Sequence, residues 1–291
     1  MIFKKSIEKI VNKDDLTLQE MSSLIETVMT GKLSEAQVAA ILVGMRIKGE
    51  TVAEITAAAR VMRKFSAKVL VPQKKLLDTC GTGGDSSNSF NISTASAFVT
   101  AAADIPIAKH GNRSASSNSG SADLLEHAGC RIDLDENQVS KCITEIGIGF
   151  MFAPMHHSAL KQVSIIRKQL GLRTMFNVLG PLTNPANASY QLIGVYHESL
   201  VNRIALVLRN LGCDRAMVVC SKRGMDEIAL DSPTIVSELK HGEVISYEIT
   251  PEMYGMKYSS HDDIRVDDPI GSLKLINDIF DGKEGAAADI V

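Results

Sequence analysis

The chain reads Leu76-Leu-Asp-Thr-Cys-Gly81-Thr-Gly-Gly-Asp85-Ser-Ser-Asn-Ser-Phe-Asn-Ile-Ser-Thr-Ala-Ser-Ala-Phe98, a short apolar strand followed by a glycine-rich turn and a helix with hydroxyls in its first turn. Glycines let backbone amides approach an anion, and a helix N-terminus adds unpaired N–H groups and a favourable dipole. The stretch therefore predicts a phosphate-binding turn. Taken alone, such a motif is more often only a tight turn. The acidic Asp85 inside it, however, indicates ribose hydroxyls or a metal ion nearby.

Strands and helices alternate downstream of this turn, whereas the segments upstream have helical periodicity only. Before residue 66 the apolar spacing is helical, and the capping boxes Ser34-Glu-Ala-Gln37 and Thr51-Val-Ala-Glu54 begin two helices. The pattern predicts an α/β fold with a small all-helical domain at residues 1–70 and a larger α/β domain at residues 73–291 around a mixed, mainly parallel sheet. The expected strands are 76–77, 105–108, 148–153, 190–196 and 216–220, with a hairpin formed by 234–240 and 243–249.

The bulk composition is that of a globular protein. The 291 residues carry 31 Lys+Arg against 34 Asp+Glu, a net charge of −3, so no overall positive field favours DNA or RNA. The five cysteines form no Cys-x-x-Cys pair and are predicted to be reduced thiols. No run of 18 apolar residues and no signal peptide are found, so we expect a cytoplasmic protein without a membrane span.

A second polar segment, Lys109-His-Gly-Asn-Arg113-Ser-Ala-Ser-Ser-Asn-Ser-Gly-Ser-Ala-Asp123, also follows a predicted strand. Lys109 and Arg113 supply positive charge, and the serines, asparagines and glycines supply flexibility and neutral hydrogen bonds. This combination suits a loop that closes over a polyanion. The alternative is a solvated serine-rich linker, which rarely carries such a basic sequence against a strand.

Two further segments contain candidate ligands. A predicted helix within residues 153–177 places Leu160, Ser164 and Arg167 on one face, so Arg167 could point inward. The preceding His156-His157 pair lacks a third metal ligand nearby, which favours a pocket-lining role over zinc. Asp226-Glu227 follows the last predicted parallel strand. Adjacent acids are usually only surface residues, but beside a phosphorylated substrate they could bind Mg²⁺.

In this order, the segments resemble the anthranilate phosphoribosyltransferase family, of the nucleoside phosphorylase and phosphoribosyltransferase class. The resemblance covers essentially the whole chain. Its most specific strings are Gly81-Thr-Gly-Gly-Asp85, Asn91-Ile-Ser-Thr94, Lys109-His-Gly-Asn-Arg-Ser and Arg173-Thr-Met-Phe-Asn-Val-Leu-Gly-Pro-Leu-Thr-Asn-Pro185.

The resemblance implies a magnesium-dependent pentosyltransferase of tryptophan biosynthesis. It implies a homodimer formed through the helical domain, which helices from about 158–180 would join. Anthranilate would be bound by Gly81, Asn112, His157 and Arg167, and Mg²⁺ by Ser93, Asp226 and Glu227. Phosphoribosyl pyrophosphate would be bound by Gly81, Gly84, Asp85, Ser89, Asn91, Ile92, Ser93, Thr94, Lys109, His110, Gly111, Asn112, Arg113, Ser114, Ala115, Ser116, Ser117 and Ser121. No catalytic base is assigned, because an aromatic amine attacks as the neutral species.

The chain departs from the family pattern at three places. It has His157-Ser-Ala-Leu160 where His-Pro-Ala-Met is common, and Asn118 where lysine is frequent. The family's final helices would follow residue 291, so we expect a missing C-terminal segment.

Two alternative functions are a pyrimidine nucleoside phosphorylase and a noncatalytic nucleic-acid-binding paralogue. The similarity of residues 157–185 to the anthranilate enzyme and the acidic pair disfavour the first. The net charge of −3 and the same acidic pair disfavour the second.

Overall fold

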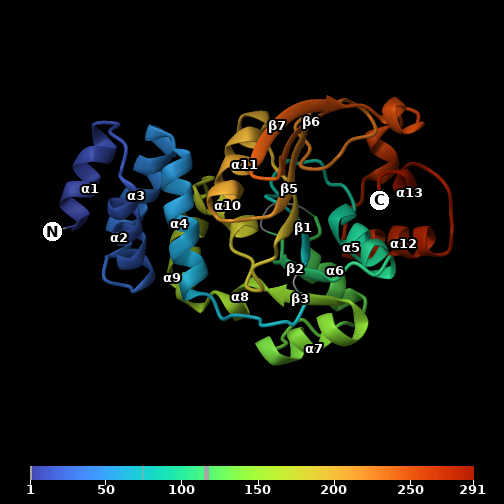
Figure 1. The fold of residues 1–291 in the computed structure, drawn as a ribbon, viewed down its shortest axis with the longest axis horizontal. Coiled ribbons are helices and arrows are strands. Elements are labelled where there is room, and N and C mark those ends of the chain that lie inside the picture. Colours follow the sequence, from blue (N-terminus) through green and yellow to red (C-terminus); the bar gives the residue numbers. More distant parts are fainter. Residues whose placement is uncertain (1, 74, 115–117) are drawn as a thin grey trace.

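The computed structural model describes residues 2–73, 75–114 and 118–291. A helical bundle forms its N-terminal end (Figure 1). Both predicted capping boxes are confirmed, and Thr17 with Glu20 forms a third. Each box satisfies two backbone N–H groups at the start of a helix, which is why these helices begin where they do. The four helices are α1 (Ile2–Val11), α2 (Leu18–Met29), α3 (Glu35–Lys48) and α4 (Val52–Phe65).

A seven-stranded sheet lies in the middle of the molecule, with the order β3-β2-β1-β4-β5-β6-β7. The first five strands in this order are parallel, and β6 and β7 form the predicted antiparallel hairpin. The α/β fold with a mixed, mainly parallel sheet is therefore confirmed. The strands are β1 (Leu77–Gly81), β2 (Ile107–Gly111), β3 (Ile148–Phe152), β4 (Tyr190–Gly194), β5 (Arg215–Ser221), β6 (Thr234–Lys240) and β7 (Glu243–Ile249).

Helices cover the sheet and extend to the C-terminal end. They are α5 (Ile92–Ala102), α6 (Ser121–His127), α7 (Glu136–Ile146), α8 (Ala153–His156), α9 (Lys161–Leu170), α10 (Phe176–Leu179), α11 (Val201–Asn210), α12 (Pro269–Phe280) and α13 (Ala286–Asp289). Short 3₁₀ turns lie at Ser158–Leu160, Gly180–Leu182, Glu198–Leu200, Pro251–Tyr254 and His261–Ile264. In Figure 1, α5, α12 and α13 lie on the side of the sheet opposite the helical bundle.

The segment 153–177, predicted as one helix, is broken into several pieces. A non-helical residue, His157 (ψ 53°), separates α8 from the next turn, and Gly171 ends α9 in the left-handed conformation with φ 59°. Glycine adopts this conformation without the steric cost that a Cβ atom brings. The break turns the chain back toward the sheet before α10.

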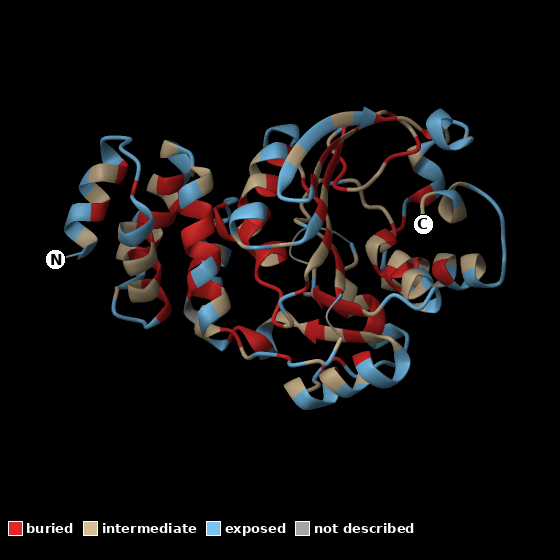
Figure 2. Cartoon of the chain, in the orientation of Figure 1, coloured by how far each residue is buried: buried red, intermediate tan, exposed pale blue. Residues whose placement is uncertain are grey.

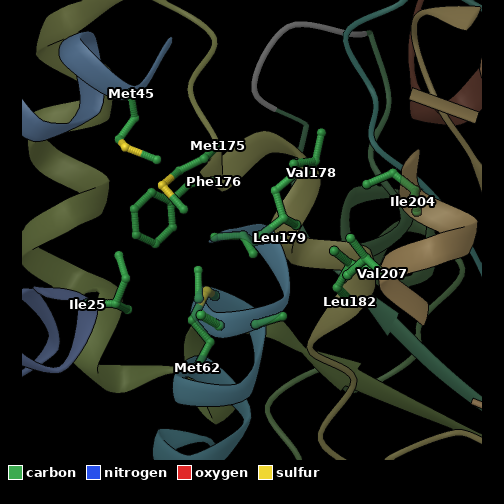
Figure 3. Close-up of a cluster of buried hydrophobic side chains, with 14 of the residues drawn as sticks. Ile25, Met45, Met62, Met175, Phe176, Val178, Leu179, Leu182, Ile204 and Val207 are labelled. Atoms are coloured by element: carbon green, nitrogen blue, oxygen red, sulfur yellow. The ribbon is translucent and has the colours of Figure 1, made fainter. Parts of the chain in front are cut away.

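One continuous core joins the helical bundle to the sheet. Figure 3 shows Ile25 and Met45 of the bundle around Phe176, and Leu182 beside Val207 of α11 (Val201–Asn210), all in one cluster. Leu179 is fully buried, and Figure 2 shows buried residues on α4 and in the strands of the sheet. Burial of apolar surface is the main favourable term in folding, so this shared core holds the bundle against the α/β part.

Candidate active site

The candidate site lies where the parallel strands end. Because β1, β2, β4 and β5 are parallel, the loops that follow them meet at one edge of the sheet. Ligands in open α/β sheets commonly bind at this edge. The glycine-rich turn, the basic loop and the acidic pair, which are far apart in sequence, all belong to these loops.

Three hydrogen bonds join the glycine-rich turn to residues that are distant in the sequence. Gly83 N–H donates to Asp226 Oδ2 at 2.7 Å, Thr82 N–H donates to the Gly194 carbonyl at 3.0 Å, and Tyr196 N–H donates to Thr82 Oγ1 at 3.1 Å. A Cβ atom on Gly194 would lie 1.5 Å from the Asp226 carbonyl oxygen. Glycine is therefore required there for the acidic loop to approach β4.

Three carboxyl groups gather beside this turn. Asp226 N–H donates to Asp85 Oδ2 at 3.3 Å. Burial, followed by the charge of Asp85, raises the pKa of Asp226 to about 7. Burial, followed by the charge of Asp226, raises the pKa of Glu227 to about 8. Burial and, to a smaller extent, the neighbouring carboxylates disfavour the charged forms of both groups, and a bound cation would favour them.

The acidic group fits a magnesium ion that also uses substrate oxygens. Ser93 lies next to these acids, since its backbone N–H interacts with Glu227. In the described ranges, no set of three His, Cys, Asp or Glu side chains forms a complete metal site. Mg²⁺ usually retains water and takes one or two carboxylates together with substrate phosphates, so a partial protein site suits it.

Lys109 is buried beneath the turn at 2% exposure. Its Nζ donates to the Thr79 carbonyl and to Ser93 Oγ, the latter at 3.2 Å. Burial lowers the pKa of Lys109, and Asp78 and Glu227 counteract this effect. The ammonium group thus links β1, β2 and the start of α5.

Asp78, which the sequence analysis did not single out, fixes the strands below the site. Its carboxylate accepts from His110 N–H at 3.1 Å and from Asn184 Nδ2 at 2.8 Å. Burial raises the pKa of Asp78 to about 6, although these donors and Lys109 oppose the shift. Asn184 also donates to the Ala108 carbonyl at 2.7 Å, so it joins β1 to β2.

The predicted basic loop is only partly described, since Ala115, Ser116 and Ser117 lie outside the described residues. Arg113 is paired with Asp123 at 3.2 Å and with Glu126, and its guanidinium lies 5.6 Å from the ring centroid of Phe152. Its charge is therefore already balanced by two acids of α6. Asp123 also accepts from Ser114 N–H at 3.0 Å.

The remaining predicted residues near the start of α5 differ in what they offer a ligand. Asn91 Oδ1 accepts from Ser119 Oγ at 2.7 Å and from Ser272 Oγ at 2.8 Å. Ile92 is 3% exposed in the core, so only its backbone could reach a ligand. Ser89 Oγ lies 3.2 Å from Ser87 Oγ.

Gly111 and Ser121 pack together, because a Cβ atom on Gly111 would lie 2.2 Å from Ser121 Oγ.

His110, His157 and Arg167 are predicted site residues that have buried polar atoms without a partner in the described part of the chain. The ring centroids of His110 and His157 are 5.1 Å apart, and burial lowers their pKa values to about 3 and about 4. The guanidinium of Arg167 lies 5.9 Å from the ring centroid of Phe176. Its buried Nε has no partner among the residues that the structure describes. A buried donor without an acceptor suits an anionic ligand.

Arg173 and Tyr196 also contact the turn and were not predicted as site residues. Arg173 Nη2 donates to the Gly84 carbonyl. Arg173 lies in a string that carried the family resemblance, but nothing in that string indicates its partner. Its spatial neighbour is 89 positions away in the sequence.

The fold and site define a glycosyltransferase built from two modules. The glycosyl transferase family helical bundle domain matches residues 4–66, and the glycosyl transferase family a/b domain matches residues 73–291. The anthranilate phosphoribosyltransferase of Marinomonas sp. is 52% identical over 293 residues, which cover all of this chain and 85% of that protein. The chain belongs to the anthranilate phosphoribosyltransferase family.

Solved structures agree with this membership. The crystal structure of the anthranilate phosphoribosyltransferase from Thermus thermophilus has a TM-score of 0.92 and 38% identity, covering 98% of this chain and 85% of that chain. The enzyme from Saccharomyces cerevisiae in complex with PRPP and Mg has a TM-score of 0.89 and 25% identity, covering 99% and 84%. No helix in the described part of the chain is long and apolar enough to cross a membrane.

Proposed function

We propose that the protein transfers the phosphoribosyl group of phosphoribosyl pyrophosphate to the amine of anthranilate, giving N-(5-phosphoribosyl)anthranilate and pyrophosphate. This reaction is the second step of tryptophan biosynthesis from chorismate. The observation that carries the proposal is the hydrogen bond between Gly83 of the anion-binding turn and Asp226 of the acidic pair. Membership of the family supports it.

The glycine-rich turn, the start of α5 and the basic loop would bind the phosphoribosyl pyrophosphate. The N–H groups of Thr82 and Gly83 are bonded within the protein, so the remaining amides of the turn and the dipole of α5 would attract the anion. Ser93, Asp226 and Glu227 would hold Mg²⁺, whose use is supported by the yeast relative solved with PRPP and Mg. When bound, the ion would withdraw charge from the pyrophosphate leaving group.

Arg167, Asn112, Gly81 and His157 would form the anthranilate site. The unpartnered Nε of Arg167 supports a charge-assisted bond to the substrate carboxylate. The burial of His157 keeps its imidazole neutral, so it can line an aromatic pocket without adding charge. These contacts would align the amine with carbon 1 of the ribose.

Leaving-group stabilisation would dominate the rate enhancement. Positive charge develops on the sugar as its bond to pyrophosphate breaks, and the departing oxygens gain negative charge. Lys109 is held in place by the Thr79 carbonyl and Ser93 Oγ, so its charge would need little reorganisation to act on the leaving group. The neutral aromatic amine attacks without a strong base, and its extra proton leaves after the bond has formed.

The proposal is tested by the loss of anthranilate fluorescence when phosphoribosyl pyrophosphate and magnesium are added together to the purified protein. We expect loss only when both are present, and release of one pyrophosphate for each anthranilate consumed. Folded protein that consumes no anthranilate would contradict the proposal. Phosphate-dependent cleavage of a pyrimidine nucleoside, or salt-sensitive DNA binding, would instead support one of the two alternatives.

The homodimer and the cytoplasmic location remain predictions. Apolar side chains on the helical bundle support an interface there, since Ile47 is 68% exposed and Leu18 is 47% exposed. Light scattering tests the dimer, which would have twice the chain mass of 31.4 kDa. A mass of one chain at micromolar concentration would contradict it.

A further inference from the structure

Arg173, which is not among the predicted substrate-binding residues, holds the glycine-rich turn at Gly84. Its Nη2 donates to the carbonyl of Gly84, and its guanidinium carbon lies 4.2 Å from the ring centroid of Tyr196. A Cβ atom on Gly84 would lie 3.5 Å from both Nε and Nη2 of Arg173. The planar cation therefore lies against the turn on one side and an aromatic ring on the other, a favourable cation–π arrangement.

Tyr196 is itself attached to the same turn. Its N–H donates to Thr82 Oγ1 at 3.1 Å, and Thr82 N–H donates to the Gly194 carbonyl at 3.0 Å. The start of the turn is thus held by the chain that leaves β4, and its end is held by Arg173. Gly84 needs such a restraint, because at φ 77° it has the conformational freedom of a glycine.

The Gly84 carbonyl and the Asp85 N–H belong to one peptide group, so the orientation of one fixes the other. The peptide between Gly84 and Asp85 is planar and trans, so its carbonyl and its N–H point in opposite directions. Fixing the carbonyl toward Arg173 therefore directs the Asp85 N–H away from Arg173. No residue in the described ranges accepts a hydrogen bond from this N–H. It is available to a phosphate oxygen.

The backbone of Arg173 is held by the helical bundle. Arg46 of α3 donates from Nη1 to the Arg173 carbonyl. A chain of two contacts therefore runs from the bundle through Arg173 to the glycine-rich turn. A displacement of α3 would reach the turn through this residue.

We propose that Arg173 is a positioning residue, which orients the Gly84–Asp85 peptide for the pyrophosphate of the phosphoribosyl donor, and that Arg46 acts on the turn through the main chain of residue 173. The inference rests on the proposed function. It concerns binding of the donor and not of the aromatic acceptor, because neither arginine belongs to the predicted anthranilate site.

The test measures the Kd of phosphoribosyl pyrophosphate by calorimetry in the presence of Mg²⁺, together with the KM of each substrate. Arg173→Ala should raise the donor Kd about tenfold, the effect of losing one charge-assisted hydrogen bond. The anthranilate KM should change by less than about twofold. Arg173→Lys should recover part of the loss, because lysine keeps a donor but not the planar stacking. Arg209→Ala, which removes an exposed arginine from the end of α11, serves as the matched control and should bind the donor normally.

A double-mutant cycle tests the link to the bundle. Arg46→Ala should weaken donor binding in the wild type but add little in the Arg173→Ala background, since both changes break one chain of contacts. Additive effects would overturn the role of Arg46. A wild-type donor Kd in Arg173→Ala, or equal increases in both KM values, would overturn the role of Arg173.

Two further outcomes separate the inference from folding and from the proposed function. If Arg173→Ala does not fold, Tyr196→Leu removes the ring beneath the guanidinium and should weaken donor binding in the same selective way; an unchanged Kd would then overturn the inference. If the folded wild type binds no phosphoribosyl pyrophosphate, the proposed function fails. If the wild type binds it and the Arg173 variants bind it equally well, only the inference fails.

Discussion

Gly83 N–H donates a 2.7 Å hydrogen bond to Asp226 Oδ2, across 143 positions of sequence. The bond places a carboxylate of the predicted metal site directly against the turn that is predicted to bind the pyrophosphate. Two functions of Asp226 can therefore be separated by substitution. Its charge would attract the cation, and its oxygen holds the turn.

Asp226→Asn should keep the hydrogen bond and lose the charge. Its amide oxygen can accept from Gly83 N–H, whereas Asp226→Ala removes both the acceptor and the charge. We expect Asn to weaken magnesium activation on the order of 10- to 100-fold with little effect on the melting temperature. Titration of activity with Mg²⁺, and thermal unfolding of both variants, check this. Wild-type magnesium dependence in Asp226→Asn would remove this residue from the metal site. Gly180→Ala is a suitable control, since its added methyl group meets no atom within 4 Å.

The stability of the magnesium-free protein should fall as the pH rises from the ordinary pKa values of 3.8 and 4.5 to about 8 and should level off above that. The pKa of Asp226 is raised from 3.8 to about 7, and the pKa of Glu227 is raised from 4.5 to about 8. At pH values between the unfolded and the folded pKa, the folded state therefore binds more protons than the unfolded state. The stability from these protons is present below the unfolded pKa values and is lost as the pH rises through the folded ones. We expect Mg²⁺ to raise the melting temperature on the order of 2 to 4 °C more at high pH than at low pH. An equal effect of Mg²⁺ at both ends of this range would contradict the prediction.

Arg167→Ala should reduce the use of anthranilate selectively. Loss of a charge-assisted bond to the substrate carboxylate costs about 1.5–3 kcal/mol, which is roughly a 10- to 150-fold fall in kcat/KM for anthranilate. Steady-state kinetics with anthranilate varied at saturating donor measures it. Lys168→Ala, which removes the adjacent exposed cation, is the control. An unchanged anthranilate KM in Arg167→Ala would exclude the assigned contact.

Asn184→Ala should destabilise the protein without touching the substrate. The change removes the donor at 2.8 Å from Asp78 and leaves a fully buried carboxyl group with one partner fewer. Leaving a buried polar group unsatisfied costs about 1–3 kcal/mol, and more for a charged one. Urea unfolding should show this loss, whereas Asn137→Ala on the exposed face of α7 should stay within about 0.5 kcal/mol of the wild type. Equal stability of the two variants would show that Asp78 finds another partner.

Local sequence was sufficient for the starts of two N-terminal helices and for the hairpin. The capping boxes at Ser34 and Thr51 involve groups three residues apart, and the hairpin at His241-Gly242 depends on backbone conformations of adjacent residues. The single helix expected at residues 153–177 was wrong, because the pattern of apolar residues did not reveal the breaks at His157 and Gly171.

The sequence by itself determined the class of site: glycines that admit an anion, a basic loop, and an acidic pair after a strand. Only the tertiary structure decided which groups meet. It paired Arg113 with Glu126 and Asp123, and it brought Arg173 to Gly84. These contacts join residues that are 10, 13 and 89 positions apart, and they depend on the order of the strands in the sheet. Hydrogen bonds need atoms within about 3 Å of each other, and only the completed sheet and its shared core bring these atoms so close.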